Sequence, residues 1–325
     1  MKLREIIFSV LTFSTLVSCV SESNTSGAIN LNATPTTEKD LKEIVETKEY
    51  VSFEDSLIFD AEDQIISHVT NVCMSDSNLF VLDDKGLIAS FDNKTGKLKR
   101  AVNKKGHGNG EYVNPSSLSA ANGYLYVLDV PNFVVQYDEN LNYVRKISLA
   151  MSFPALDLQK TKDGFVAFCF YAPDGAVKVF DDDGNLLKSY SCNENKIPSM
   201  LVTNNVIVRT DNGIFIIDAM SDTLYELKND ELTPLFGLSD VPADSDSENL
   251  EMKMYSCYPF ENKVFTFYFS NNYLKGQIYD LTTHKSVSGL LGFVPSFMKN
   301  GKFYGFYPNA KDENKYILMR HKINE

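Results

Sequence analysis

The 325-residue chain contains no tryptophan and only four histidines. The missing tryptophan excludes the Trp-Asp signature of WD40 repeats. The histidines have no metal-like spacing, and the sequence lacks a G-x-S-x-G elbow, an H-E-x-x-H pair and a P-loop. Basic residues are outnumbered by acidic ones, 31 to 43. The formal net charge of −12 argues against a nucleic-acid-binding protein, because such a protein needs a basic footprint.

Long hydrophobic runs are missing as well, so no transmembrane helix is predicted. The first 18 residues have the layout of a signal peptide, with two basic residues before an apolar run over 6–17. The run ends in Leu16-Val17-Ser18-Cys19, which resembles the bacterial lipobox, where signal peptidase II cuts before a cysteine that carries lipid. We therefore expect lipidated Cys19 to anchor the protein in the cell envelope, at the periplasmic or surface face of the outer membrane. An ordinary secretory signal with a chance cysteine is the alternative.

Two further features follow the signal. Residues 19–45 are rich in Ser, Thr, Asn, Glu and Lys, and this composition predicts a flexible tether. The four remaining cysteines (Cys73, Cys169, Cys192 and Cys257) form no C-x-x-C motif and fit no zinc pattern. Buried free thiols are favoured, because Cys73 and Cys169 lie in apolar runs, and a Cys169–Cys192 disulfide is the alternative.

From residue 46 onward, one pattern recurs: a short apolar run, a polar turn and a second apolar run. Runs of 4 to 6 residues rich in β-branched and aromatic side chains, separated by turns such as Asp84-Lys85-Gly86, predict hairpins. Further strands are expected before and after the hairpins, as at 69–74 and 97–102. Four strands per repeat of about 40–45 residues match a propeller blade. The copies lie at 79–92, 125–138, 165–181, 206–218, 264–280 and 303–320.

Six copies predict an all-β, six-bladed β-propeller over residues 46–325, with four antiparallel strands per blade. The last copy has no outer strand after it, so residues 49–59 are expected to complete that blade and close the ring. A five-bladed ring with separate ends is the alternative. In the fourth blade, the first strand is expected at 200–203. The acidic stretch 238–252 predicts a projecting loop, with a calcium loop as the alternative.

The connection between the first two copies is Gly106-His107-Gly108-Asn109-Gly110-Glu111-Tyr112-Val113-Asn114-Pro115. It resembles the G-x-G-x-G-E-[YF]-x-x-P connection of six-bladed, NHL-like β-propellers. With the lipobox and the repeats, the chain resembles the six-bladed propeller lipoproteins of Bacteroidetes. Most of these have no established activity, so the resemblance implies fold and location. The glycines also suit a dinucleotide loop, but no helical period follows them, and a tight crossing between blades is favoured.

One face of such a propeller carries both the turns between second and third strands and the crossings between blades. We expect a ligand-binding face there, because exposed aromatics, amides and carboxylates suit sugars or peptides. The same residue types also form turns for backbone reasons alone, which is the alternative for each. The candidate residues are His107, Glu111, Tyr112, Asn132, Phe133, Tyr171, Asp174, Asp211, Asn271 and Tyr273.

Together these features predict a lipid-anchored, extracytoplasmic binding or scaffold module without catalysis or cofactor. Its expected partners are the membrane, through the lipid, and a protein, peptide or glycan, but no nucleic acid. The alternative is a metal-dependent lyase or hydrolase at the channel, because related NHL-like propellers include such enzymes. Among the histidines, however, only His107 lies on a predicted loop of that face. A sensor component of a glycan-uptake system is a third interpretation, without a specific residue signal.

Overall fold

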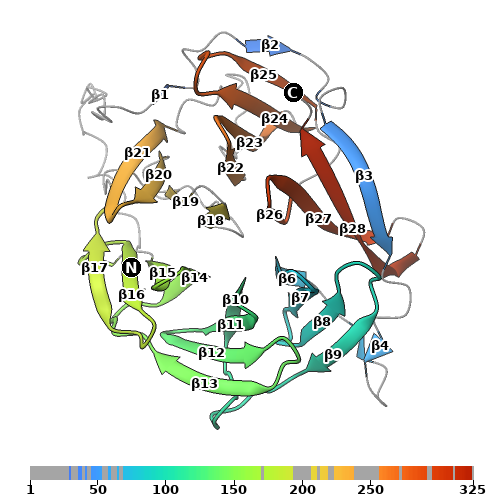
Figure 1. The fold of residues 1–325 in the computed structure, drawn as a ribbon, viewed down its shortest axis with the longest axis vertical. Helices are drawn as coiled ribbons and strands as arrows, with labels where there is room; N and C mark the ends of the chain where they lie inside the picture. Colours follow the sequence, from blue (N-terminus) through green and yellow to red (C-terminus); the bar gives the residue numbers. More distant parts are fainter. Residues whose placement is uncertain are drawn as a thin grey trace, which may run out of the picture.

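The computed structural model describes residues 69–169, 172–192, 206–210, 213–218, 223–237, 256–270, 273–290, 295–309 and 312–323. It also describes the shorter segments 29–30, 36–38, 41, 45–52, 58–59 and 64–65. Within these ranges the chain is built almost wholly from strands, which form six radial sheets around a central axis (Figure 1). None of these residues belongs to a helix long and apolar enough to cross a membrane.

Each blade has four antiparallel strands, which are given below in order from the axis outward. Blade 1 contains β6 (Val69–Met74), β7 (Asn78–Asp83), β8 (Ile88–Asp92) and β9 (Leu98–Val102), and blade 2 contains β10 (Pro115–Ala121), β11 (Tyr124–Asp129), β12 (Phe133–Asp138) and β13 (Tyr143–Ser148). Blade 3 contains β14 (Ala155–Lys160), β15 (Gly164–Cys169), β16 (Val177–Asp181) and β17 (Leu186–Tyr190), and blade 4 contains β18 (Ile207–Thr210), β19 (Gly213–Asp218), β20 (Thr223–Lys228) and β21 (Glu231–Gly237). Blade 5 contains β22 (Ser256–Phe260), β23 (Lys263–Ser270), β24 (Tyr273–Asp280) and β25 (Ser286–Leu290), and blade 6 contains β26 (Phe297–Lys299), β27 (Lys302–Asn309), β28 (Asp312–Ile323) and β3 (Val45–Ser52).

The structure confirms the all-β, six-bladed propeller and its closure by an N-terminal strand. β3 pairs antiparallel with β28, with Val51 opposite Leu318 and Val45 opposite Ile323. The closing strand begins four residues earlier than the predicted segment 49–59, and only residues 49–52 of that segment belong to it. The five-bladed alternative is wrong. A short separate hairpin, β4 (Ile58–Phe59) with β5 (Gln64–Ile65), follows the closing strand.

In blade 4, each strand of the predicted hairpin is expected one place further from the axis than the structure shows. The hairpin at 206–218 forms the first and second strands, β18 and β19, instead of the second and third. The third and fourth strands, β20 and β21, are joined by Asn229 and Asp230, whose φ angles of 50° and 63° suit a two-residue hairpin turn. The sequence does not distinguish the two arrangements, because every hairpin in a blade has the same apolar–turn–apolar pattern. Residues 200–203 and the acidic stretch 238–252 lie outside the described residues.

The N-terminal segment follows the outer rim of the ring. β1 (Ile29–Asn30) adds a parallel fifth strand to blade 4, and β2 (Thr36–Glu38) does the same for blade 5 (Figure 1). Leu41 is fully buried in the core shared by blades 4, 5 and 6. Strand addition satisfies backbone groups that an open sheet edge leaves unpaired. From residue 29 on, therefore, parts of the predicted tether belong to the propeller rim. Residues 19–28, with Cys19, lie outside the described residues, and the tether there stays a prediction.

The aspartate that ends most copies of the repeat closes a turn. In blades 1, 2 and 3, this carboxylate follows the third strand and accepts hydrogen bonds from backbone N–H groups in the turn to the fourth strand. The shortest of these contacts is 2.8 Å, from Asn185 N to Asp181 Oδ1. The bonds favour the ionised form, and those from Thr95 and Lys94 lower the pKa of Asp92 to about 2. The aspartate that recurs in the repeat therefore stabilises a turn and does not indicate a ligand site.

All four described cysteines are free thiols, so the Cys169–Cys192 disulfide is wrong and the free-thiol prediction is confirmed. Cys169, Cys192 and Cys257 are buried, whereas Cys73 is partly exposed. The Cys169 Sγ lies 3.7 Å from the Met151 Sδ, in the core between blades 2 and 3. Burial raises the pKa of Cys169 to about 11, so this thiol is expected to be unreactive at neutral pH.

His321 makes the seam between β28 and β3 sensitive to acid. It pairs with Thr47 beside a bulge, and its side chain is 1% exposed. Burial lowers its pKa from 6.5 to about 4, so the folded state favours the neutral ring. With respect to His321, the free energy of unfolding is therefore highest above pH 6.5. It falls by up to roughly 3 kcal/mol as the pH drops to 4 and below.

We therefore expect urea unfolding to show a larger loss of stability from pH 7 to pH 4.5 in the wild type than in His321→Gln. The control is His284→Gln, because His284 is an exposed histidine in a turn of blade 5. Equal pH dependence in the wild type and in His321→Gln would rule out this role for His321.

Candidate functional site

A cavity of about 780 Å³ lies on the propeller axis and is lined by residues from all six blades. Its walls are the innermost strands. Its mouth lies among the turns between first and second strands, where Asp76, Asn122, Glu261 and Asn300 line it. This volume is within the range of about 300–1,000 Å³ that is typical of small-ligand sites.

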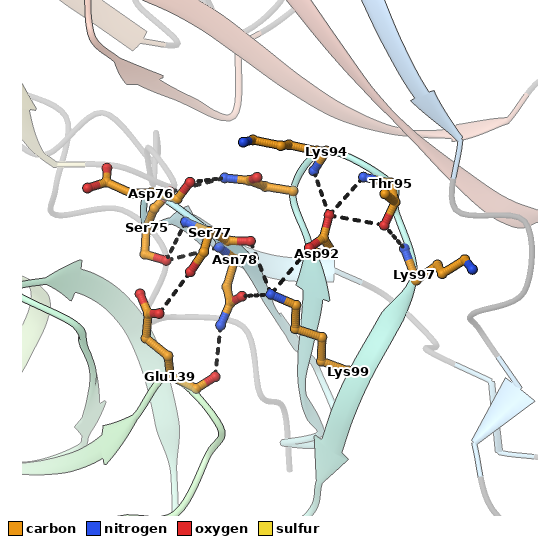
Figure 2. A network of polar contacts seen from close by, with 11 residues as sticks. Ser75, Asp76, Ser77, Asn78, Asp92, Lys94, Thr95, Lys97, Lys99 and Glu139 are labelled. Carbon is orange, nitrogen blue, oxygen red and sulfur yellow. Dashed lines mark hydrogen bonds and ion pairs between the residues drawn. The ribbon is translucent and has the colours of Figure 1, made fainter.

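The Ser75–Asn78 turn of blade 1 forms a rigid part of this mouth (Figure 2). The Ser75 Oγ accepts hydrogen bonds from the backbone N–H groups of Ser77 and Asn78 at 3.4 and 3.0 Å. The Asn78 side chain donates to the Glu139 carbonyl at 2.8 Å, and the Ser77 hydroxyl donates to the Glu139 carboxylate at 2.8 Å. Because Glu139 belongs to blade 2, these bonds fix two neighbouring blades together at the mouth.

An ion pair joins the last blade to the first at the same mouth. The Lys299 Nζ lies 2.8 Å from the Asp76 Oδ1 and donates to the Met74 carbonyl at 3.3 Å. The hydrogen bond from Lys299 holds the pKa of Asp76 below its usual value. The Asp76 side chain is 98% exposed, so solvent screens the pair and we assign it little stabilising energy. The pair positions the Lys299 side chain at the mouth and compensates its charge.

Two amide side chains line the cavity interior. Asn71 on β6 accepts a hydrogen bond from Leu118 N at its Oδ1, at 3.2 Å, and Gln159 on β14 accepts one from the Ser119 hydroxyl at its Oε1, at 3.1 Å. Both oxygens are therefore held by β10, which lies between the two strands. Among the described residues, neither amide NH2 group has a hydrogen-bond partner. The cavity wall thus presents two oriented donors.

The wall formed by blades 5 and 6 is aromatic. Phe260 and Phe297 line the cavity, and the Phe297 ring stacks on Tyr304 with centroids 5.1 Å apart and planes 6° apart. Tyr258 also lines the cavity and donates its hydroxyl hydrogen bond to the Pro295 carbonyl at 3.1 Å. Figure 1 places β22, which ends at Phe260, and β10 on opposite sides of the axis. The cavity therefore combines aromatic side chains from blades 5 and 6 with amide side chains from blades 1 and 3.

A buried carboxylate holds three inner strands together behind the cavity. The Asp157 Oδ1 accepts hydrogen bonds from the Ser117 hydroxyl at 2.7 Å and from Leu158 N at 2.8 Å, and its Oδ2 accepts one from Ile207 N at 2.8 Å. These partners belong to blades 2, 3 and 4. Burial raises the pKa of Asp157, against the opposing effect of these hydrogen bonds. Its role is to fix the spacing of the strands that form the cavity wall.

None of the predicted residues whose side chains the structure describes (His107, Glu111, Tyr112, Asn132, Phe133 and Asp174) lines this cavity. The connection 106–115 instead forms a tight crossing between blades 1 and 2. Gly110 has a φ of 78°, a backbone conformation that favours glycine, whereas a Cβ on Gly106 would meet only the end of the Glu111 side chain, at 2.1 Å. The Tyr112 ring is fully buried and its hydroxyl donates to the Gly86 carbonyl at 2.8 Å, which removes it from any ligand.

Other predicted residues also have local structural partners. Glu111 accepts a hydrogen bond from Gly108 N at 2.7 Å, and Asp174 forms an ion pair at 2.7 Å with the fully buried Lys178. Asn132 donates to the Leu149 carbonyl at 3.4 Å, and Phe133 lies under the Lys146 ammonium at 4.9 Å from its ring centroid. His107 is exposed.

Lys146 brings part of the predicted set together, because it also donates to the Glu111 carbonyl at 2.9 Å. Tyr171, Asp211 and Asn271 lie outside the described residues, as does the side chain of Tyr273. The strands that flank Asp211 are the first and second of blade 4, so its connection is of a different type from the one predicted.

The residues that the sequence analysis missed are on inner strands. The available signal was the alternation of polar residues with leucine on β14, as at Asp157 and Gln159, and the single amide Asn71 beside Val72 on β6. No group of three or more His, Cys, Asp or Glu side chains in the described part of the chain is arranged to hold a metal ion.

The fold and this site define a six-bladed β-propeller with an axial cavity. The chain belongs to the family described as a domain of unknown function, DUF4934, whose model matches residues 27–324. A candidate exported protein of Bacteroides fragilis is similar in structure, with a TM-score of 0.66, 16% sequence identity, and coverage of 89% of this chain and 98% of that one. A DUF4221 family member of Bacteroides vulgatus has a TM-score of 0.55 and 10% identity, and covers 86% and 99% of the two chains. These likenesses show the fold alone. No curated protein matches the sequence.

Proposed function

We propose that the protein is a binding module that is held outside the cytoplasm by lipid on Cys19 and receives its ligand in the axial cavity. The observation that carries the proposal is the cavity itself, to which all six blades contribute. Its lining offers both polar and apolar contacts, because β10 orients two amide side chains and a stacked neighbour holds one aromatic ring. The similar fold of the candidate exported protein of Bacteroides fragilis supports the extracytoplasmic location.

Replacing Cys19 by Ala tests the anchor. We expect Cys19→Ala to move the protein from the membrane pellet to the soluble fraction, because several buried acyl chains contribute about 0.8 kcal/mol per CH2 and the variant would have none. Fractionation and immunoblotting of cells that express the full chain give the measurement. Cys73→Ala is the matched control and should stay in the pellet. A Cys19→Ala protein that remains membrane-bound contradicts lipid anchoring.

Two phenylalanines test which face binds. Phe297 lines the cavity, whereas Phe133 lies on the face that the sequence analysis favoured. A thermal-shift screen of the full chain in detergent, against panels of oligosaccharides and peptides, is expected to raise Tm for the wild type and for Phe133→Ala. Ligand at 100 times Kd adds about 2.7 kcal/mol of stability, enough for a shift of several degrees. Phe297→Ala should lose most of the shift. A shift that is lost in Phe133→Ala and kept in Phe297→Ala would place binding on the opposite face.

A further inference from the structure

We propose that the ligand is a neutral saccharide that lies with one ring face on Phe297 and with its hydroxyl groups on the amide donors of Asn71 and Gln159. The inference rests on the proposed binding function and adds the chemical class of the ligand. It is carried by three fixed groups in one cavity, each from a different blade.

Asn71 supplies the first donor. Its side chain is only 9% exposed, and its Oδ1 is occupied by Leu118 N at 3.2 Å. This bond sets the amide orientation, so the NH2 group is the part left over, and within the described residues it has no partner. It is not one of the fully buried side-chain atoms that lack a partner in the described part of the chain, so it is open to the cavity that Asn71 lines. An acceptor oxygen in the cavity is therefore expected opposite this group.

Gln159 supplies the second donor on the other side of β10. The Ser119 hydroxyl donates to its Oε1 at 3.1 Å, while the same hydroxyl oxygen accepts Lys160 N at 2.9 Å. The Lys160 bond leaves the hydroxyl hydrogen free for the Gln159 oxygen, so the NH2 group of this cavity-lining residue is the part without a partner among the described residues. Since Leu118 and Ser119 are neighbours, the two donors flank one strand at a fixed spacing.

Phe297 supplies an apolar surface at the edge of the core between blades 1 and 6, against which it also packs. One of its faces is covered by Tyr304, with the two planes 6° apart, and the residue is partly exposed and lines the cavity. The stacked neighbour holds the ring in place before any ligand binds. An aromatic pair of this kind contributes about 0.5–1.5 kcal/mol beyond the area it buries.

A saccharide matches this combination. A pyranose ring has a C–H face that lies on an aromatic ring and an edge of hydroxyl groups that accept and donate hydrogen bonds. Glu139 and Glu261 at the mouth offer acceptors for hydroxyl donors. A neutral ligand is favoured because the charged side chains that line the cavity have both signs: Asp76, Glu139 and Glu261 are acidic, and Arg209 and Lys299 are basic. Lys299 is paired with Asp76, and Arg209 donates to the Lys160 carbonyl at 2.8 Å. A peptide would supply acceptor carbonyls but needs a flat side chain for Phe297.

The test is isothermal titration of the full chain in detergent with neutral oligosaccharides chosen from a glycan array. Asn71→Asp and Gln159→Glu keep the oxygen that β10 holds and remove the NH2 donor, and each should weaken binding by about tenfold or more. Phe297→Leu keeps apolar volume, loses the flat ring, and should weaken binding by roughly threefold to tenfold. The matched control is Gln136→Glu, since Gln136 faces Arg145 outside the cavity and its affinity should not change. Thermal unfolding of each variant confirms that it folds.

Each other outcome overturns the inference in a recognisable way. Binding of peptides or acidic glycans that is sensitive to Asn71, Gln159 and Phe297 would refute a neutral saccharide but keep the binding function. Saccharide binding that is unchanged in all three variants would refute the assigned site. Failure of every glycan and peptide to bind the folded wild type would refute both the inference and the proposed function.

Discussion

A chain that begins at residue 53 is expected to lose its cooperative unfolding transition and to aggregate. The truncation removes β3, the outer strand of blade 6. Among the described strand pairings, only the pairing of β3 with β28 joins the N-terminal segment to the C-terminal strand. It also removes Leu41 and Val45 from the buried core. The exposed edge of β28 would then template intermolecular pairing. Domains are stable by about 5–15 kcal/mol, and we expect this change to remove most of it.

The matched control is a chain that begins at residue 45. It keeps β3 but loses β1, β2 and Leu41, so it separates ring closure from the rim strands. We expect it to fold with a lowered urea midpoint. Circular dichroism during urea unfolding and size-exclusion chromatography provide the readouts. If the chain starting at residue 53 stays monomeric with an unchanged urea midpoint, closure by β3 does not stabilise the propeller.

Asp157→Ala is expected to destabilise the protein by about 3–5 kcal/mol, the largest effect we assign to one side chain. The substitution leaves the N–H donors of Leu158 and Ile207 and the Ser117 hydroxyl without their acceptor, in a site that is 3% exposed. Asp157→Asn keeps one acceptor oxygen and should cost less, about 1–3 kcal/mol. Asp163→Ala, at an exposed position of the same blade, is the control and should stay within about 0.5 kcal/mol of the wild type.

The pH dependence gives a second readout for Asp157. Burial raises the pKa of Asp157 in the folded state above the unfolded value of 3.8. The contribution of this group to the free energy of unfolding is therefore complete below pH 3.8 and is lost as pH rises through the folded-state pKa. Asn does not titrate. The difference in unfolding free energy between the wild type and Asp157→Asn is therefore expected to be larger at pH 4 than at pH 7. A difference that grows with pH would show that the folded-state pKa is lowered.

The local elements could be predicted because their signals are local. Alternating apolar runs with Asp, Asn and Gly turns indicate hairpins wherever they occur, and blades 1 to 3 follow the expected strands closely. Blade 4 shows the limit of this argument. Every hairpin has the same pattern, so only the strand order in space shows that 206–218 contains the first and second strands. The same ambiguity affected the type of turn assigned to Asp211.

The binding site could not be predicted in the same way. The motif at 106–115 is the most conspicuous stretch in the sequence, yet its glycines and Tyr112 serve the crossing between blades. Asn71, Gln159 and Phe297 are single residues far apart in the sequence, and each has an ordinary neighbourhood. They form a site only because inner strands from different blades meet at one axis.

By itself, the sequence determined the fold class, the number of blades and the closure by an N-terminal strand, since hydrophobic period, turn chemistry and repeat length depend on neighbouring residues. Free cysteines followed from the same local evidence. The tertiary structure decided which end of the propeller carries the open cavity, which amide NH2 groups there lack a partner among the described residues, and how far the N-terminal segment follows the rim. These depend on contacts between strands separated by 40 or more residues, such as Ser117 with Asp157 or Asp157 with Ile207, and only packing around the axis brings those strands together.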